Sequence, residues 1–286
     1  MWVCLVGNVF LCIFKGIIGF VSGSLAVIAD SLHSGADVLV SIVAIITVYL
    51  GNKPPDRTHP YGHGKTEFIG GVFIGFVLLC GSACVIVSSI GHLLQKGPPS
   101  RPHFIALAAA AISILINETL FRWTICAARH VNSAAIEAEA WDNRSDAFSS
   151  MPVFLGVLGA QFGFSSLDPL AALFVGLLVG KIGFQLLSKN LHGLMDVPLD
   201  SEEISRIREL VVDVPGVKGI DYLRTRGMGR HYLADLQILV NASTTVEKSN
   251  AIAREVRSAL RREIKHLEDI TIACRGHSER QKEKTK

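Results

Sequence analysis

Residues 24–50 decide the fold, and they read SLAVIADSLHSGADVLVSIVAIITVYL. A helix needs about 20 residues to cross about 30 Å of hydrocarbon, and this apolar stretch is longer than that. It contains three side chains that can carry a charge near neutral pH: Asp30, His33 and Asp37. Such side chains are costly inside a membrane and usually serve a function. The stretch therefore predicts a membrane span with a functional site inside it.

Further apolar stretches of similar length precede and follow this one. They lie at about 2–20, 68–94, 103–127, 134–162 and 165–187, with polar or turn-forming residues between them. Lipid offers the backbone no hydrogen-bond partner, so helices are the natural structure for these spans. We therefore expect an α-helical membrane protein with six transmembrane helices, within a first domain of residues 1–196.

The composition supports a membrane part followed by a soluble part. The chain has 286 residues, of which 49% are hydrophobic and 19% are charged, whereas soluble domains carry about 25% charged residues. Residues 1–196 hold 22 charged side chains and residues 197–286 hold 31. This distribution excludes a single soluble domain, a disordered chain and a secreted disulfide scaffold. The net charge of +3 is too small to suggest nucleic acid as a partner.

The last third of the chain has the pattern of a small α+β domain. Ser201 is a suitable N-cap for a helix, and a Pro-Gly break follows at 215–216. The predicted order is αββαβ, with elements at about 201–212, 217–225, 231–240, 245–264 and 269–274. We expect a cytoplasmic dimerisation or regulatory domain over residues 197–276 and a polar tail over residues 277–286.

The basic residues of the short loops predict the orientation in the membrane, because cytoplasmic loops are enriched in Lys and Arg. With the N-terminus inside, the inner loops and the segment after the last span hold five: Lys53, Arg57, Lys65, Arg129 and Lys189. The outer loops hold only Lys96 and Arg101. We therefore expect a multi-pass membrane protein with its C-terminal domain in the cytoplasm.

Two pairs of ionisable residues have the spacing of a metal site. His33 and Asp37 are four residues apart in the second span, as are Asp142 and Asp146 in the fifth. Residues at this spacing share one face of a helix, so two such faces meeting would supply four ligands for a divalent cation. The alternative is an ion-pair network that holds the bundle together. A third pair at this spacing, Glu118 and Arg122, is better explained as a structural ion pair.

Two motifs make the pattern more specific. Residues 23–37 (GSLAVIADSLHSGAD) resemble the second helix of cation diffusion facilitators, and residues 140–147 (AWDNRSDA) resemble their fifth. The similarity extends over nearly the whole chain. Two further segments, residues 116–123 (INETLFRW) and 191–196 (LHGLMD), resemble the sequences of the magnetosome-membrane branch of the family. The resemblance implies localisation in a bacterial inner membrane or a magnetosome membrane.

The resemblance also implies functional residues. It places the transport site at His33, Asp37, Asp142 and Asp146. It implies a weaker, accessory metal site in the loop at Asp56, His59 and His63. It further implies an interlock at the membrane–cytoplasm junction between Lys65 and Asp196, although Lys65 could equally be a basic interfacial anchor.

The cytoplasmic domain departs from the pattern of zinc exporters in this family. Gln237, Asn250 and Ala273 stand where those proteins have histidine ligands, which puts a binuclear zinc site there in doubt. Asp235 and His266 are weak candidates for metal ligands in the magnetosome branch, and the alternative is polar surface at a dimer interface.

The function that follows is efflux of a divalent cation from the cytoplasm to a magnetosome lumen or the periplasm, by cation/proton antiport. The resemblance implies that Asp142 replaces a histidine found in many zinc-transporting members, and oxygen ligands favour iron(II) or manganese(II) relative to zinc. The expected cargo is iron(II), with manganese(II) or zinc as the alternatives. We expect no permanent cofactor and no enzymatic activity. The resemblance implies a homodimer, with a heterodimer with a related transporter as an alternative.

A second function stays open at this stage. The chain could be a membrane scaffold that stabilises a sister transporter and recruits assembly proteins, with its intramembrane carboxylates kept mainly for structure. A metal-dependent membrane hydrolase is disfavoured, because no substrate-handling polar residues accompany the four candidate ligands.

Overall fold

A computed structural model describes residues 2–94, 102–131, 134–229, 231–264 and 267–277. The chain divides into two compact units. The first contains Met1–Ile46 and Gly70–Ser188, and the second contains Thr47–Ile69 and Lys189–Lys286. Most residues of the six long helices lie in the first unit, while the α+β domain lies in the second.

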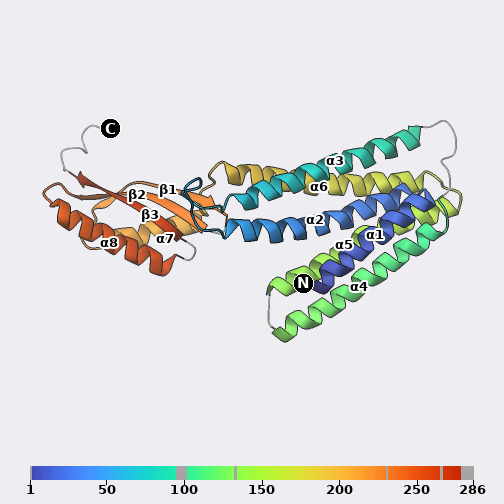
Figure 1. Cartoon of the computed structure of the whole chain (residues 1–286), viewed down its shortest axis with the longest axis horizontal. Helices are drawn as coiled ribbons and strands as arrows, with labels where there is room; N and C mark the ends of the chain where they lie inside the picture. Colours follow the sequence, from blue (N-terminus) through green and yellow to red (C-terminus); the bar gives the residue numbers. More distant parts are fainter. Residues whose placement is uncertain (1, 95–101, 132–133, 230, 265–266, 278–286) are drawn as a thin grey trace. The chain divides into compact units, whose positions relative to one another are not determined.

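Six long helices occupy the N-terminal two-thirds, and each runs antiparallel to its neighbour in sequence (Figure 1). Their bounds are α1 Trp2–Ser22, α2 Leu25–Gly51, α3 Thr66–Leu94, α4 Ile105–Val131, α5 Ala134–Gln161 and α6 Leu167–Leu194. Within the described part of the chain, every one of them except α5 is long and apolar enough to cross a membrane. The first half of α5 carries five charged residues, between Glu137 and Asp146. This helix therefore depends on partners inside the protein for its polar face.

The start of α2 is fixed by polar contacts with α6. Gly23 adopts a left-handed backbone (φ 68°) that lets the chain turn sharply after α1. The Ser24 hydroxyl and the Leu25 backbone N–H both donate to the Asp168 carboxylate in the first turn of α6. Ser24 in turn accepts a hydrogen bond from the backbone N–H of Val27. Together these contacts satisfy N–H groups that a helix N-terminus leaves unpaired.

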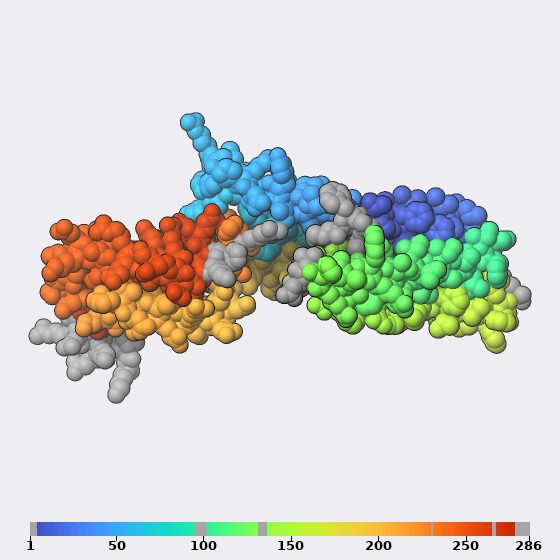
Figure 2. All heavy atoms as spheres, turned by 90° about the horizontal axis from the view of Figure 1, so that it is seen from below, coloured from blue at the N-terminus to red at the C-terminus, as the bar shows by residue number. Residues whose placement is uncertain are grey.

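Close packing between helices relies on small residues, as is usual in lipid. A Cβ atom added to Gly75 of α3 would lie 2.7 Å from the backbone nitrogen of Leu187 and 2.9 Å from the carbonyl oxygen of Gly183, both in α6. The backbones of α3 and α6 therefore touch at this point. α4 and α5 also lie side by side, and they form the continuous green surface of Figure 2.

The C-terminal domain has the predicted αββαβ order. Its elements are α7 Ser201–Val212, β1 Gly219–Met228, β2 His231–Asn241, α8 Val246–Glu263 and β3 Leu267–His277. The sheet order is β1-β2-β3, with β1 and β2 antiparallel and β2 and β3 parallel. Both helices bury apolar side chains against the sheet, Ile207 and Val211 from α7 and Val256 and Leu260 from α8. Thr245 caps α8 by accepting the Lys248 backbone N–H.

Candidate metal-transport site

Three of the four predicted transport ligands converge between α2 and α5. His33, Asp37 and Asp146 each offer one ligand atom, and these three atoms all lie within 4.8 Å of one another. Nε2 of His33 lies 3.5 Å from Oδ1 of Asp146, and only 14% and 18% of these side chains are exposed. One imidazole and two carboxylates around a single point form a donor set suited to a divalent cation.

Some polar atoms of this group have no protein partner. Among the described residues, Nδ1 of His33 and Oδ2 of Asp37 are buried without a hydrogen bond. A buried polar group without a partner costs free energy, and two neighbouring carboxylates repel each other. Both costs fall when a cation or protons occupy the centre of the group. The donor set therefore fits the binding of a cation better than a purely structural ion pair.

The fourth predicted ligand lies beside this group. Asp142 precedes Asp146 by one turn of α5 and does not belong to the set within 4.8 Å. It lines the same cavity of about 700 Å³, which also reaches Asn8 of α1, Ala44 of α2 and Ile182 of α6. Asp142 thus lies on the wall of the cavity that the other three also line.

Sequence reasoning missed one acidic residue of this cavity. Glu139 lies on α5 three residues before Asp142 and lines the cavity wall together with it. The available signal was the spacing, because positions 139, 142 and 146 follow one helix face. Glu139 also stands in a span whose charged residues are each functional candidates.

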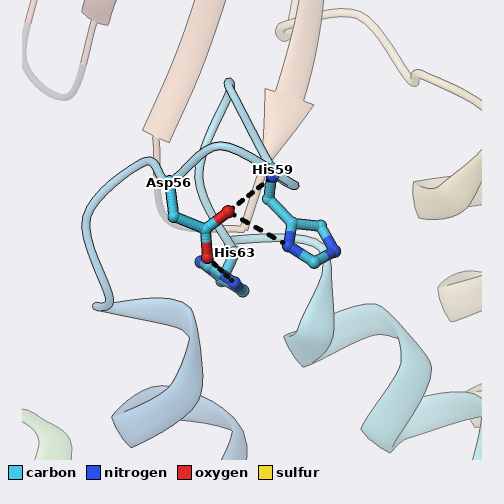
Figure 3. A group of neighbouring side chains, drawn as sticks. All are labelled: Asp56, His59 and His63. Atoms are coloured by element: carbon cyan, nitrogen blue, oxygen red, sulfur yellow. Dashed lines mark hydrogen bonds and ion pairs between the residues drawn. The ribbon is translucent and has the colours of Figure 1, made fainter.

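The loop between α2 and α3 brings its three predicted ligands together (Figure 3). Nε2 of His63 lies 3.4 Å from Oδ2 of Asp56, and Nδ1 of His59 lies 3.5 Å from Oδ1 of Asp56. The two imidazole rings are 4.5 Å apart between centroids. One atom from each side chain lies within 4.8 Å of the others. The spacing from Asp56 to His63 is therefore compatible with joint coordination.

Hydrogen bonds within the loop hold the Asp56 carboxylate in its ionised form. Oδ1 accepts hydrogen bonds from the hydroxyl and the backbone N–H of Thr58, and from the backbone N–H of His59. The Thr58 hydroxyl, followed by the His59 N–H, lowers the pKa of Asp56 to about 2. A carboxylate that stays ionised is ready to bind a cation at any physiological pH.

Lys65 and Asp196 form the predicted pair. Nζ of Lys65 lies 2.8 Å from Oδ1 of Asp196 and also donates to the carbonyl oxygen of Leu194 at 3.3 Å. Asp196 has φ 60°, an uncommon backbone for a residue with a side chain. The pair therefore joins the chain just before α3 to the chain just after α6.

The remaining sequence candidates are less informative. Asp235 lies on β2, opposite Arg224 of β1 and Thr271 of β3. His266 lies outside the described residues, so its role as a metal ligand stays a prediction. Glu118 and Arg122 form the expected ion pair, with Nε of Arg122 2.9 Å from Oε1 of Glu118.

Comparison with known proteins covers both domains. Residues 1–195 match the cation efflux transmembrane domain, and residues 199–274 match the cytoplasmic domain of cation efflux proteins. The magnetosome protein MamB of Paramagnetospirillum magneticum is 37% identical over 272 residues, covering 95% of this chain and 92% of that protein. The manganese efflux system protein MneP of Bacillus subtilis is 35% identical over 277 residues, covering 94% and 93%. MamM of Magnetospirillum gryphiswaldense is 34% identical, covering 96% and 86%.

Proposed function

This chain belongs to the cation efflux, or cation diffusion facilitator, family, and we propose that it exchanges a divalent cation from the cytoplasm for protons. Members of the family are multi-pass membrane transporters with a cytoplasmic C-terminal domain, and the apolar helices of this chain agree with that arrangement. One observation carries the proposal: His33, Asp37 and Asp146 converge within 4.8 Å on two membrane helices.

The path of the cation follows from the cavity. A hydrated cation enters past Glu139 and Asp142, whose carboxylates attract it along the wall. It then sheds water onto His33, Asp37 and Asp146. Release on the far side requires protons to replace the cation, because imidazole binds metal only in its neutral form and carboxylates only when ionised. His33 is the natural proton acceptor among the three.

Iron(II) is the favoured cargo, with manganese(II) or zinc as the alternatives. The site contains one nitrogen donor and several oxygen donors, and oxygen-rich sites favour the harder cations relative to zinc. Relatives named as magnetosome proteins and as a manganese efflux protein support this choice. Efflux into a magnetosome lumen or the periplasm follows from the same resemblance.

The remaining elements are assigned as follows. Residues 1–196 form the transport domain, residues 197–276 the dimerisation and regulatory domain, and residues 277–286 a polar tail. Asp56, His59 and His63 bind an accessory cation, and Lys65 with Asp196 interlocks the membrane–cytoplasm junction. Asp235 and His266 are weaker candidates for sensing metal. A homodimer is the proposed assembly, and a heterodimer with a related transporter is the alternative.

Transport is tested with the purified full chain in liposomes that enclose a metal-sensitive dye. Manganese(II), iron(II) and zinc are added outside in separate runs, with and without a pH gradient. We expect a signal that depends on the gradient and is lost in Asp146→Ala and Asp37→Ala. Glu118→Gln, which alters an exposed ion pair on α4, is the matched control and keeps the signal. Equal, gradient-independent signals in all variants would refute transport and leave the scaffold function.

A further inference from the structure

A second buried cluster of charged and polar side chains lies next to the transport site and shares no residue with it. Nζ of Lys15 in α1 lies 2.9 Å from Oδ2 of Asp30 in α2, and each side chain is only 1% exposed. Lys15 also donates to the hydroxyl of Ser34 at 3.0 Å. The hydroxyl of Ser150 in α5 lies 3.0 Å from both oxygens of Asp30. We name these four residues the Lys15 cluster, and they tie α1, α2 and α5 together.

Two members of the Lys15 cluster, Asp30 and Ser150, lie one helical turn beyond the transport site, whereas Ser34 lies beside His33. Asp30 precedes His33 by three residues on α2, and Ser150 follows Asp146 by four residues on α5. Because α2 and α5 run in opposite directions, both steps lead the same way along the bundle (Figure 1). Asp30 and Ser150 thus form the layer next to the transport site on the same helix interface.

The cavity opens on the opposite side of the transport site. Its walls extend from Asp146 and His33 to Glu139 at the start of α5 and to Ile45 near the end of α2. These helix ends face the cytoplasm, since α6 leads directly into the cytoplasmic domain and the helices alternate in direction. The structure is therefore open to the cytoplasm, and the Lys15 cluster stands on the side where the cation leaves.

The packing beyond the cluster is closed. Val27 of α2, Val153 and Val157 of α5 and Ala110 of α4 are all at most 1% exposed. None of these residues, and none of the Lys15 cluster, lines the cavity. A cation at His33 and Asp146 thus has an open route to the cytoplasm and a packed wall behind it.

A buried ion pair is poorly explained as a stabilising device. Removing two charges from water costs about as much as their attraction returns, and apolar replacements of both partners are often neutral or stabilising. An ammonium group just past the site also repels a dication at short range, where the dielectric constant is low. Such a pair is better suited to holding one of two helix arrangements than to raising stability.

We propose that Lys15 and Asp30 are the outer gate of the transport pathway: their pairing holds α1 and α2 against α5 and closes the route past the metal site. This inference rests on the transport function proposed above. Release of the cation then requires Asp30 to part from Ser150 and Lys15 to move aside, which opens the layer beyond Asp146. Lys15 and Asp30 are positioning residues, because neither belongs to the ligand set.

The test measures access to the wall behind the site from the outer face. In a full-length parent without cysteines, Val153→Cys places a reporter thiol one turn beyond Ser150. Spheroplasts are treated with a membrane-impermeant cationic thiol reagent, which reaches only the face opposite the cytoplasmic domain. We expect the Val153→Cys chain, the parent of this experiment, to be labelled slowly. Adding Lys15→Met/Asp30→Asn to it should make labelling at least about tenfold faster, because loss of the pair raises the outward-open population.

Two further variants separate gating from general damage. Ser150→Ala removes only the contact between α5 and Asp30, and we expect an intermediate rise in labelling. Ser89→Ala removes a buried hydroxyl on α3 that bonds the carbonyl oxygen of Val85, and labelling should stay at the parent rate. Manganese binding to each purified variant reports whether the transport ligands are still in place. If the double variant fails to bind manganese, the labelling rate of Ser150→Ala decides whether the gate exists.

The possible failures are distinguishable. A parent that moves no cation in the liposome assay refutes the proposed function itself. A parent that transports, with labelling in the double variant equal to the parent rate, refutes the gate alone. Faster labelling with manganese binding retained supports the gate, because a merely structural role for the pair would lower binding and open both faces.

Discussion

At the scale of single residues, the two aspartates of α5 have unequal places in the candidate site. Asp146 lies in the group with His33 and Asp37, whereas Asp142 lies on the cavity wall one turn away. We predict that Asp146→Asn weakens manganese binding by about 100-fold or more, and Asp142→Asn by about tenfold or less. Equilibrium dialysis of the purified chain measures both. Equal losses in the two variants would mean that Asp142 joins the ligand set when metal binds.

The loop carboxylate gives a prediction of pH dependence. The pKa of Asp56 is lowered to about 2, first by the Thr58 hydroxyl and then by the His59 backbone N–H. A lowered folded-state pKa means that the ionised carboxylate favours the folded loop above the ordinary Asp value of about 3.9. This contribution is lost as the pH falls through about 2.

Removing the hydroxyl should therefore raise this pKa. We predict that Thr58→Val moves the titration of Asp56 upward, toward the ordinary value. Carboxyl ¹³C NMR of the full chain follows the titration, and Asp56→Asn identifies the signal. Thr66→Val is the matched control, because the Thr66 hydroxyl donates to His63 and Thr47 carbonyl oxygens instead. An unchanged pKa in Thr58→Val would mean that the backbone N–H groups are sufficient.

At the scale of secondary-structure elements, the contact between α3 and α6 depends on the absence of a side chain. A methyl group at Gly75 would meet α6 backbone atoms at 2.7–2.9 Å, whereas Gly91, on the same helix, has nothing within 4 Å of its added Cβ. We predict that Gly75→Ala lowers the free energy of unfolding by about 1–3 kcal/mol. Gly91→Ala should be neutral or slightly stabilising, because Ala is the better helix former. Detergent-induced unfolding measures both, and equal stabilities would contradict the close contact.

At the scale of the whole molecule, the Lys65–Asp196 pair connects segments that are distant in sequence. Both side chains are about one-third to one-half exposed, so the pair adds little stability, at most about 1 kcal/mol. We predict that Lys65→Ala or Asp196→Ala nevertheless reduces transport several-fold, and that the exchanged pair Lys65→Asp/Asp196→Lys partly restores it. Arg206→Ala breaks another exposed ion pair, with Glu263, and should leave transport unchanged. No recovery in the exchanged pair would indicate that Asp196 matters for its backbone rather than its charge.

Much of this architecture could be predicted from local pattern. The apolar spans and the αββαβ order follow from hydropathy and periodicity, which depend on neighbours within one element. The spacing of His33 and Asp37 likewise predicted a shared helix face. The pattern also predicted that all four residues bind the cation together. Spacing within one helix does not fix how far that helix is shifted along its neighbour, so it could not show that Asp142 lies apart. The structure separates Asp142 from the other three and adds Glu139 to the cavity wall.

The sequence by itself determined that this chain crosses a membrane with ionisable residues in its spans, because burying charge in lipid is costly whatever the fold. It also determined the family, through motifs that lie along single helices. Only the tertiary structure decided which of these charges meet. Lys15 pairs with Asp30 rather than remaining isolated on α1, and the layer that they form lies beyond the site rather than within it. The reason is that distances between helices are set by the packing of whole faces, which no single segment encodes.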